Sequence, residues 1–148
     1  SIEAAGLSEN ITVYTIEQKE EAFALIEENK KKSGLENIKV IRGAAPEAMQ
    51  DLPVPTHAFI GGSGGKLKEI LNVLYQKNPK MRVVINAISL ETISELNMIL
   101  EEYPVQNEEI IQIQVNRTKK AGKYHLMQAE NPVWICSFAF GEERENED

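Results

Sequence analysis

The stretch His57-Ala58-Phe59-Ile60-Gly61-Gly62-Ser63-Gly64-Gly65-Lys66 decides the fold of this chain. A short apolar run opens directly into a glycine cluster, and apolar residues with helical spacing follow at Leu67, Ile70, Leu71 and Leu74. Glycine has no Cβ, so its backbone can approach a ligand closely, and the first turn of a helix supplies free N–H groups. The stretch therefore predicts a strand, a glycine turn and a helix, which is the geometry that α/β proteins use at ligand sites.

Strand and helix patterns alternate on both sides of this stretch. Runs of β-branched and apolar residues predict strands at residues 10–17, 38–42, 58–60 and 81–87. Patterns typical of helices follow each run, at residues 19–33, 46–49, 67–76 and 90–100. Gly34 stands where a helix C-cap belongs, and Ser89 can serve as an N-cap. Repeated strand–helix units imply a parallel sheet that is covered on both faces.

The rhythm changes after Pro104. Residues 110–115 and 133–140 both have strand patterns, but no helical pattern separates them. Two strands without a crossover helix should pair antiparallel, here at the edge of the sheet. The predicted fold class is thus α/β, with a mostly parallel, doubly wound sheet that ends in an antiparallel hairpin. That is the outline of a Rossmann-like class I methyltransferase.

Composition narrows the function classes. The chain has 148 residues and a net charge of −7, which argues against nucleic acid as a partner. No apolar run approaches the roughly 18 residues that span a bilayer, and no signal-peptide pattern opens the chain. Cys136 is the only cysteine, so an internal disulfide is excluded, and a buried thiol in a cytoplasmic protein is expected.

The two ends of the chain differ from its middle. Residues 142–148 are mostly acidic and are expected to form a solvated, disordered tail beyond one domain of residues 1–141. Ser1–Ala5 has the pattern of a helix piece with no strand or glycine turn before it. Because a central strand left out would leave its neighbours unpaired, we expect the working protein to have an N-terminal strand and glycine loop that this chain lacks.

Candidate nucleoside-binding residues follow the first two predicted strands. Glu17 ends the first strand, where a carboxylate can accept hydrogen bonds from both hydroxyls of a ribose; a solvated or helix-capping acid is the alternative. Residues 43–47 are mostly small and would leave room for a flat ring beside the backbone. A tight turn into a helix explains that segment equally well.

Other polar residues could face the same crevice as Gly61. Asn86 ends its strand, and Glu91 and Thr92 follow at the start of the next helix, although Asn86 could be a plain turn residue. Ser63 lies in an approximate nucleophile elbow, but neither histidine is placed to act as its base, so we reject a nucleophile. The spacing of cysteine and histidine residues predicts no metal site.

The one dense basic cluster comprises Arg117, Lys119, Lys120 and Lys123. In an acidic chain this cluster is a candidate for binding a carboxylate-rich substrate. An ordinary solvated loop remains the alternative.

Several segments together resemble one family, the decarboxylating precorrin methyltransferases of cobalamin biosynthesis, in particular the unit that methylates carbon 15. The residues that carry the resemblance are Ser1–Ala5, Gly43–Ala48, Phe59–Gly65, Val84–Ala87 with Leu90–Thr92, and Asn131–Val133. They occur in the order and spacing of the family over nearly the whole chain up to the acidic tail.

The resemblance implies S-adenosylmethionine as methyl donor and a ring-contracted tetrapyrrole as acceptor, with loss of carbon dioxide from the acetate on carbon 12. It implies that Glu17 holds the ribose, that Ala44 and Ala45 lie at the adenine, and that Gly61 borders the methyl. The residues assigned to the transfer site are Gly61, Gly62, Ser63 and Asn86, and those assigned to the substrate are Gly64, Glu91, Thr92, Arg117 and Asn131. The resemblance also implies a homo-oligomer, a tetramer, and work with or fusion to a domain that methylates carbon 5.

Two departures from the family pattern stand out. The glycine loop for the methionine end of the donor would lie before Ser1, and Ala44 stands where many relatives have an aspartate, so a side-chain hydrogen bond to the adenine is lost. Other hypotheses remain open: a different Rossmann-fold methyltransferase, a nicotinamide-dependent oxidoreductase, or a non-catalytic assembly fragment.

Overall fold

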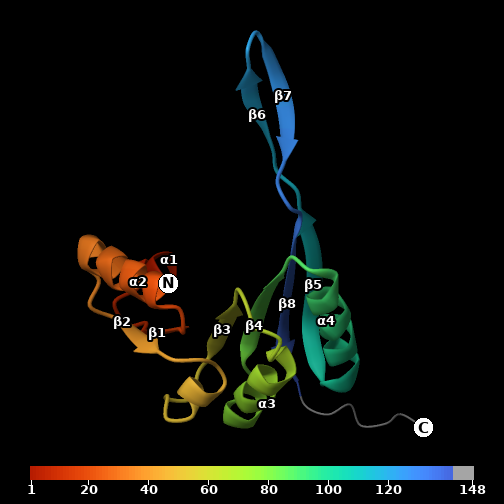
Figure 1. Cartoon of the computed structure of the whole chain (residues 1–148). Helices are drawn as coiled ribbons and strands as arrows, with labels where there is room; N and C mark the ends of the chain where they lie inside the picture. Colours follow the sequence, from red (N-terminus) through yellow and green to blue (C-terminus); the bar gives the residue numbers. More distant parts are fainter. Residues whose placement is uncertain (142–148) are drawn as a thin grey trace. The chain divides into compact units, whose positions relative to one another are not determined.

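The computed structural model describes residues 1–141, which form two compact units (Figure 1). The first unit spans Ser1–Leu52, and the second begins at Pro53. The predicted acidic tail, residues 142–148, lies outside the described residues.

The first unit is a βαβ arrangement with a short helix at each end. Its elements are α1 (Ile2–Gly6), β1 (Val13–Glu17), α2 (Glu20–Ser33), β2 (Ile38–Arg42) and the 3₁₀ helix η1 (Glu47–Met49). The strands β1 and β2 pair in parallel, as the crossover helix α2 requires. Gly34 ends α2 with a left-handed backbone (φ +68°), which confirms it as the C-cap.

The second unit is built on a mixed four-stranded sheet. Its elements are β3 (His57–Ile60), α3 (Leu67–Lys77), β4 (Arg82–Ala87), α4 (Leu90–Glu102), β5 (Val105–Ile113), β6 (Asn116–Ala121), β7 (Tyr124–Ala129) and β8 (Val133–Phe140). The strand order is β3-β4-β8-β5, with β3 and β4 parallel and β8 antiparallel to both of its neighbours. The predicted antiparallel ending of the chain is confirmed.

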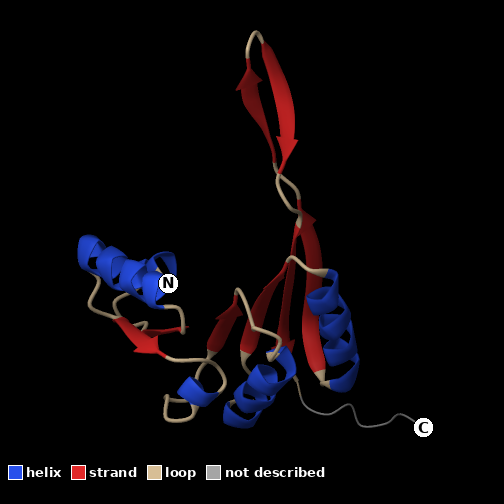
Figure 2. Ribbon diagram, in the orientation of Figure 1, coloured by secondary structure: helices blue, strands red, loops and turns tan. Residues whose placement is uncertain are grey.

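One face of this sheet carries the core. Val83 and Ile85 of β4 are buried on the same face as their cross-strand partners Phe138 and Cys136 of β8. On α3, the ring of Tyr75 packs edge-on against Phe140 of β8, with ring centroids 5.0 Å apart. The helices α3 and α4 bury their apolar residues against these strands, so the two helices cover this face of the sheet (Figure 2).

The N-terminus of α4 is capped as expected. The Ser89 hydroxyl accepts a hydrogen bond from the backbone N–H of Thr92 at 3.2 Å. This bond satisfies one of the free N–H groups of the first turn and fixes the direction in which the chain leaves β4.

For residues 116–129 the alternative of an ordinary solvated loop is wrong. The basic cluster lies on an antiparallel hairpin of β6 and β7, paired from Asn116↔Ala129 to Ala121↔Tyr124. Every residue of these two strands is exposed, so neither face has the apolar alternation that marks a half-buried strand. The strand β5 begins at Val105, earlier than the predicted residue 110. Its first residues are mostly polar and exposed, so they too lack an apolar alternation.

Candidate functional site

The glycine turn after β3 depends on residues without a side chain. Gly64 and Gly65 have positive φ values of 58° and 81°, a region that other residues adopt at a cost. The N–H of Lys66 donates to the carbonyl of Ser63 at 3.1 Å, which closes the turn just before α3 begins. The turn thus presents main chain rather than side chains after β3.

A cavity of about 300 Å³ lies at this turn. It occupies the carboxyl ends of the parallel strands β3 and β4, where open α/β sheets bind ligands. A Cβ added at Gly62 would meet nothing within 4 Å, so the wall there is bare main chain facing open space. The lining residues are Ile60, Gly61, Gly62, Ser63, Gly64, Gly65, Leu67, Ile85, Asn86, Ile88 and Thr92.

The lining is electrically neutral. Among the described residues, it includes no ionisable side chain, and its polar side chains are those of Ser63, Asn86 and Thr92. The Thr92 hydroxyl is 3.0 Å from that of Ser89, so it is already hydrogen bonded. The cavity can therefore bind and orient a ligand, but its lining offers no side chain with the ordinary properties of a general acid or base at neutral pH.

Asn86 has an unsatisfied carboxamide. Its Oδ1 is buried and has no hydrogen-bond partner among the described residues. An unpaired buried acceptor costs roughly 1–3 kcal/mol. A ligand donor in the cavity, met by a rotation of the carboxamide, would recover that cost, which favours Asn86 as a ligand contact over a plain turn residue.

The predicted nucleoside-binding residues lie together in the first unit. Glu17 ends β1 opposite Arg42, and the N–H of Gly43 donates to the Glu17 carbonyl at 3.1 Å. Ala44 and Ala45 follow Gly43 directly. The structure thus brings Glu17, Ala44 and Ala45 to the same end of the β1–β2 pair.

The carboxylate of Glu17 also has a local role. Its Oε1 accepts a hydrogen bond from the N–H of Lys19, the residue that precedes α2, at 2.8 Å. The carboxylate therefore holds the backbone of the N-cap residue of α2. A carboxylate has about four acceptor positions, so this bond leaves capacity for ligand hydroxyls.

Three predicted substrate residues are not part of the cavity lining. Glu91 is exposed in the first turn of α4, and Asn131 is exposed just before β8. Arg117 lies on β6, and its Nε is 3.2 Å from Glu130 Oε1. Arg117 is exposed on a strand of the hairpin, whereas the sequence offered a loop for this segment.

Part of the lining was not expected from the sequence. Ile88 lines the cavity and is 69% exposed, and Leu67 and Ile85 contribute apolar walls. The available signal was an apolar residue directly after a strand end, between Ala87 and the capping Ser89.

Three further features concern other chemistries. Within residues 1–141, no group of three or more His, Cys, Asp or Glu side chains is placed to hold a metal ion. In the same range, no helix has both the length and the apolar character needed to cross a membrane. Burial, with a smaller contribution from Glu108, raises the pKa of the Cys136 thiol to about 11, so the thiol is un-ionised at neutral pH.

Comparison with known proteins identifies the family. The sequence profile described as the precorrin methyltransferase domain matches residues 1–139. The chain belongs to the precorrin methyltransferase family. The resemblance inferred from the glycine block and the segments around it is thereby confirmed.

Individual family members match over most of the chain. A curated protein of Pyrobaculum calidifontis, described as a probable cobalt-precorrin-6B C(15)-methyltransferase (decarboxylating), is 34% identical over 93% of this chain and 71% of its own length. The crystal structure of the precorrin-6y C5,15-methyltransferase of Geobacter metallireducens matches with a TM-score of 0.82 and 32% identity, over 93% of this chain and 73% of that one.

A third relative extends the comparison. The precorrin 8W decarboxylase of Methanobacterium thermoautotrophicum matches with a TM-score of 0.73 and 32% identity, over 86% of this chain and 69% of that one. These likenesses confirm the predicted Rossmann-like methyltransferase fold and place the chain among methyltransferases.

Proposed function

We propose that this protein transfers a methyl group from S-adenosylmethionine to carbon 15 of a precorrin-6 type tetrapyrrole and releases carbon dioxide from the acetate on carbon 12, as a step of cobalamin biosynthesis. The observation that carries the proposal is the neutral cavity walled by the main chain of Gly61–Gly65, in a chain of the precorrin methyltransferase family. Relatives at 34% and 31% identity are described as probable cobalt-precorrin-6B C(15)-methyltransferases (decarboxylating), which supports the methylated carbon and the decarboxylation.

The residues present fit the methyl donor. A wall without side chains at Gly62 leaves room for the donor's methyl-bearing end, and we assign Gly61, Gly62, Ser63 and Asn86 to the transfer site. In the first unit we assign Glu17 to the ribose hydroxyls and Ala44 and Ala45 to the adenine ring. Ala44 has no polar side chain, so recognition of the adenine edge there falls to the backbone.

The sulfonium donor supplies a methyl group that is already activated, so the chain's own task is alignment and exclusion of water. A new bond forms between the methyl and carbon 15 as the methyl–sulfur bond breaks, and its electron pair stays on sulfur. The apolar walls of Ile85 and Ile88 keep water from the reacting carbon. A neutral lining suits this transfer because the positive charge of the donor is lost as the reaction proceeds.

Loss of carbon dioxide needs an electron sink rather than a base. The bond between the acetate methylene and the carboxylate breaks, its electron pair enters the conjugated macrocycle, and carbon dioxide leaves. A carboxylate is poorly stabilised beside apolar walls, so a neutral cavity favours the state in which the charge has spread over the ring.

The remaining assignments concern the edge of the substrate. Gly64 and Thr92 line the cavity, and we assign them to contacts with the macrocycle. We assign the exposed Glu91, Arg117 and Asn131 to its peripheral polar groups, with Arg117 as the partner of a carboxylate. We further propose a cytoplasmic homo-oligomer, a tetramer, that works with or is fused to a carbon-5 methyltransferase domain.

Product analysis tests the proposal. The natural full-length protein is incubated with a donor labelled with ¹³C in its methyl group and with precorrin-6 type substrates, with and without cobalt, and the products are examined by NMR. We expect label on carbon 15 and release of the carbon-12 carboxyl group. Label on another carbon, or binding of NAD in place of S-adenosylhomocysteine in calorimetry, would contradict it.

A further inference from the structure

The helix α3 begins at the cavity without a capping side chain of its own. Leu67, its first residue, is buried and lines the cavity. Lys66 stands at the N-cap position, and an ammonium group has no acceptor with which to cap the free N–H groups of the first turn. The first turn of α3 therefore needs an acceptor from elsewhere in the molecule.

Glu95 of α4 supplies this acceptor. Its Oε1 accepts a hydrogen bond from the backbone N–H of Lys68 at 3.3 Å. Glu95 follows the cavity-lining Thr92 by three residues, so the two side chains lie one turn apart on the same face of α4. Lys68 is held a second time, because its Nζ is 2.6 Å from Glu102 Oε2. Helix α4 thus fixes both the main chain and a side chain of the first turn of α3.

These contacts fix the point at which the glycine turn ends. The turn starts from β3, whose last residue, Ile60, pairs with Ile85 of β4. It ends at α3, and four of the five residues 61–65 are glycine, which has more backbone freedom than any other residue. The position of the cavity wall therefore depends on its two anchors, and Glu95 holds the second one.

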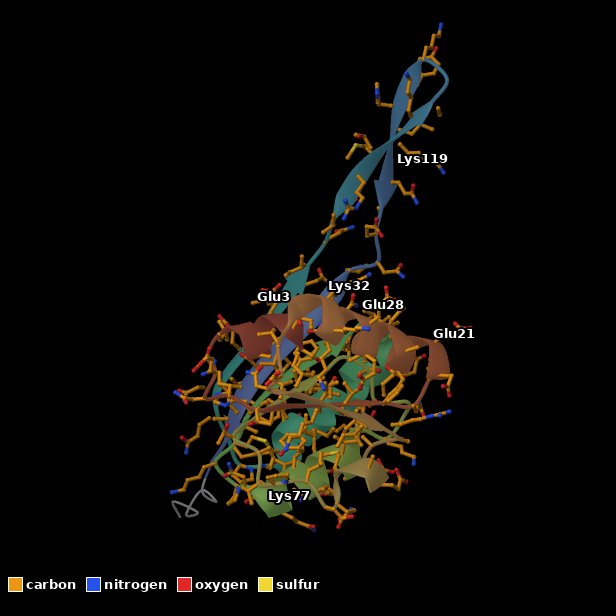
Figure 3. All side chains as sticks on the ribbon, turned by 90° about the vertical axis from the view of Figure 1, so that its left-hand side faces the viewer. Glu3, Glu21, Glu28, Lys32, Lys77 and Lys119 are labelled. Carbon is orange, nitrogen blue, oxygen red and sulfur yellow. The ribbon has the colours of Figure 1, made fainter. Side chains whose placement is uncertain are left out.

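The first turn of α3 also carries positive charge. The aligned peptide dipoles of a helix place a partial positive charge at its N-terminus, and Lys66 and Lys68 stand on either side of Leu67. The opposite end of the helix has the charge that suits it, because Lys77 lies in the last turn, at the negative end of the dipole (Figure 3). A positive wall at the cavity would repel a cationic ligand.

Two carboxylates of α4 offset this charge. Glu102 pairs with the Lys68 ammonium, and Glu95 accepts its bond at the positive end of the helix itself. Glu69 also lies in the first turn of α3, but it is exposed, so water and salt screen its charge. Glu95 is half-buried, and its charge therefore acts more strongly on the neighbouring wall.

We propose that Glu95 is a positioning residue of the methyl-donor site. Its carboxylate holds the first turn of α3, and with it the glycine wall, and it offsets the positive charge of that turn beside the sulfonium of the donor. The second role rests on the donor proposed above, whereas the first does not. Because the donor becomes a neutral thioether when it loses its methyl group, the carboxylate favours S-adenosylmethionine over S-adenosylhomocysteine.

Amide hydrogen exchange tests the first role in the ligand-free natural full-length protein. Glu95→Ala removes the acceptor, while Glu95→Gln keeps an acceptor oxygen without the charge. In Glu95→Ala we expect the amides of residues 61–69 to exchange at least about 3-fold faster, with those of β4 and β8 unchanged, and in Glu95→Gln we expect a smaller change. An unchanged exchange rate at the Lys68 amide in Glu95→Ala would overturn this role.

Calorimetry with the two ligands tests the second role. In both variants the ratio of the dissociation constants should shift about 3- to 10-fold against S-adenosylmethionine. Damage to the fold weakens both ligands alike, so the ratio reports the charge. The matched control, Glu101→Gln, removes the same charge from an exposed position of α4 and should leave the ratio unchanged.

The outcomes separate this inference from the proposed function. A ratio that stays the same in both Glu95 variants, or that shifts equally in Glu101→Gln, would overturn the role of Glu95 toward the sulfonium while the methyl-transfer proposal stands. A natural protein that binds neither ligand would overturn the proposed function together with that role, and the exchange rates would still decide whether Glu95 positions the turn.

Discussion

Asn86 carries a cost in folding that its place in the cavity explains. Its Oδ1 is buried and unpaired, so Asn86→Ala removes an unfavourable group, and the free energy of unfolding should stay the same or rise. The same change removes a ligand hydrogen bond, so kcat/KM should fall about 10- to 100-fold. Urea unfolding and steady-state kinetics measure the two effects.

Asn86→Asp is the matched variant, because it keeps the shape and adds a charge to a neutral lining. We expect it to lose more activity than Asn86→Ala. A protein destabilised by Asn86→Ala with unchanged kinetics would show that the carboxamide serves the fold alone.

Cys136 makes the free energy of unfolding depend on pH in the alkaline range. Burial raises the pKa of its thiol from an ordinary 9.0 to about 11, so the unfolded chain ionises first as pH rises. The stabilisation is complete below about pH 9 and is lost as pH rises through about 11. Urea unfolding at about pH 8 and about pH 10.5 should therefore show a decline of order 2 kcal/mol that Cys136→Ala lacks. An equal decline in both proteins would assign the effect to other groups.

At the scale of an element, the glycine turn between β3 and α3 contains glycines of two kinds. At one position an added Cβ would have room, and at another the backbone conformation disfavours any other residue. A Cβ at Gly62 would meet nothing within 4 Å, so Gly62→Ala should change the free energy of unfolding by less than about 0.5 kcal/mol while narrowing the cavity and raising KM. Gly65 has φ +81°, so Gly65→Ala should cost about 1 kcal/mol or more.

Thermal unfolding and donor affinity by calorimetry distinguish these two glycine variants. Loss of stability in Gly62→Ala with unchanged affinity would place the cavity's ligand elsewhere. The pair is well matched because both positions lie in the same turn and gain the same methyl group.

The elements also show what a sequence pattern can and cannot predict. The βα units were predictable because each half-buried strand and helix alternates with its own period, as in β4 and α3. The hairpin of β6 and β7 was not predictable. Lys119, Lys120 and their cross-strand partners are exposed on both faces, so the sequence has no apolar period there.

At the scale of the whole molecule, the candidate site was predictable where it is made of backbone. The glycines at Gly61–Gly65 and the strand-end amide of Asn86 predicted the cavity, because glycine lets a ligand approach the backbone closely. The substrate residues were harder, because Arg117 lies on a strand that the sequence did not reveal. Ile88 was not predicted as a lining residue, because single exposed apolar residues are common on protein surfaces.

The most direct measurement of the central claim is a crystal structure of the natural full-length protein with S-adenosylhomocysteine and a precorrin-6 type acceptor. We expect the donor sulfur at the main chain of Gly61–Gly64 and carbon 15 of the acceptor beside Asn86. Both ligands bound away from the glycine turn, with the cavity at Asn86 filled by protein side chains, would contradict it.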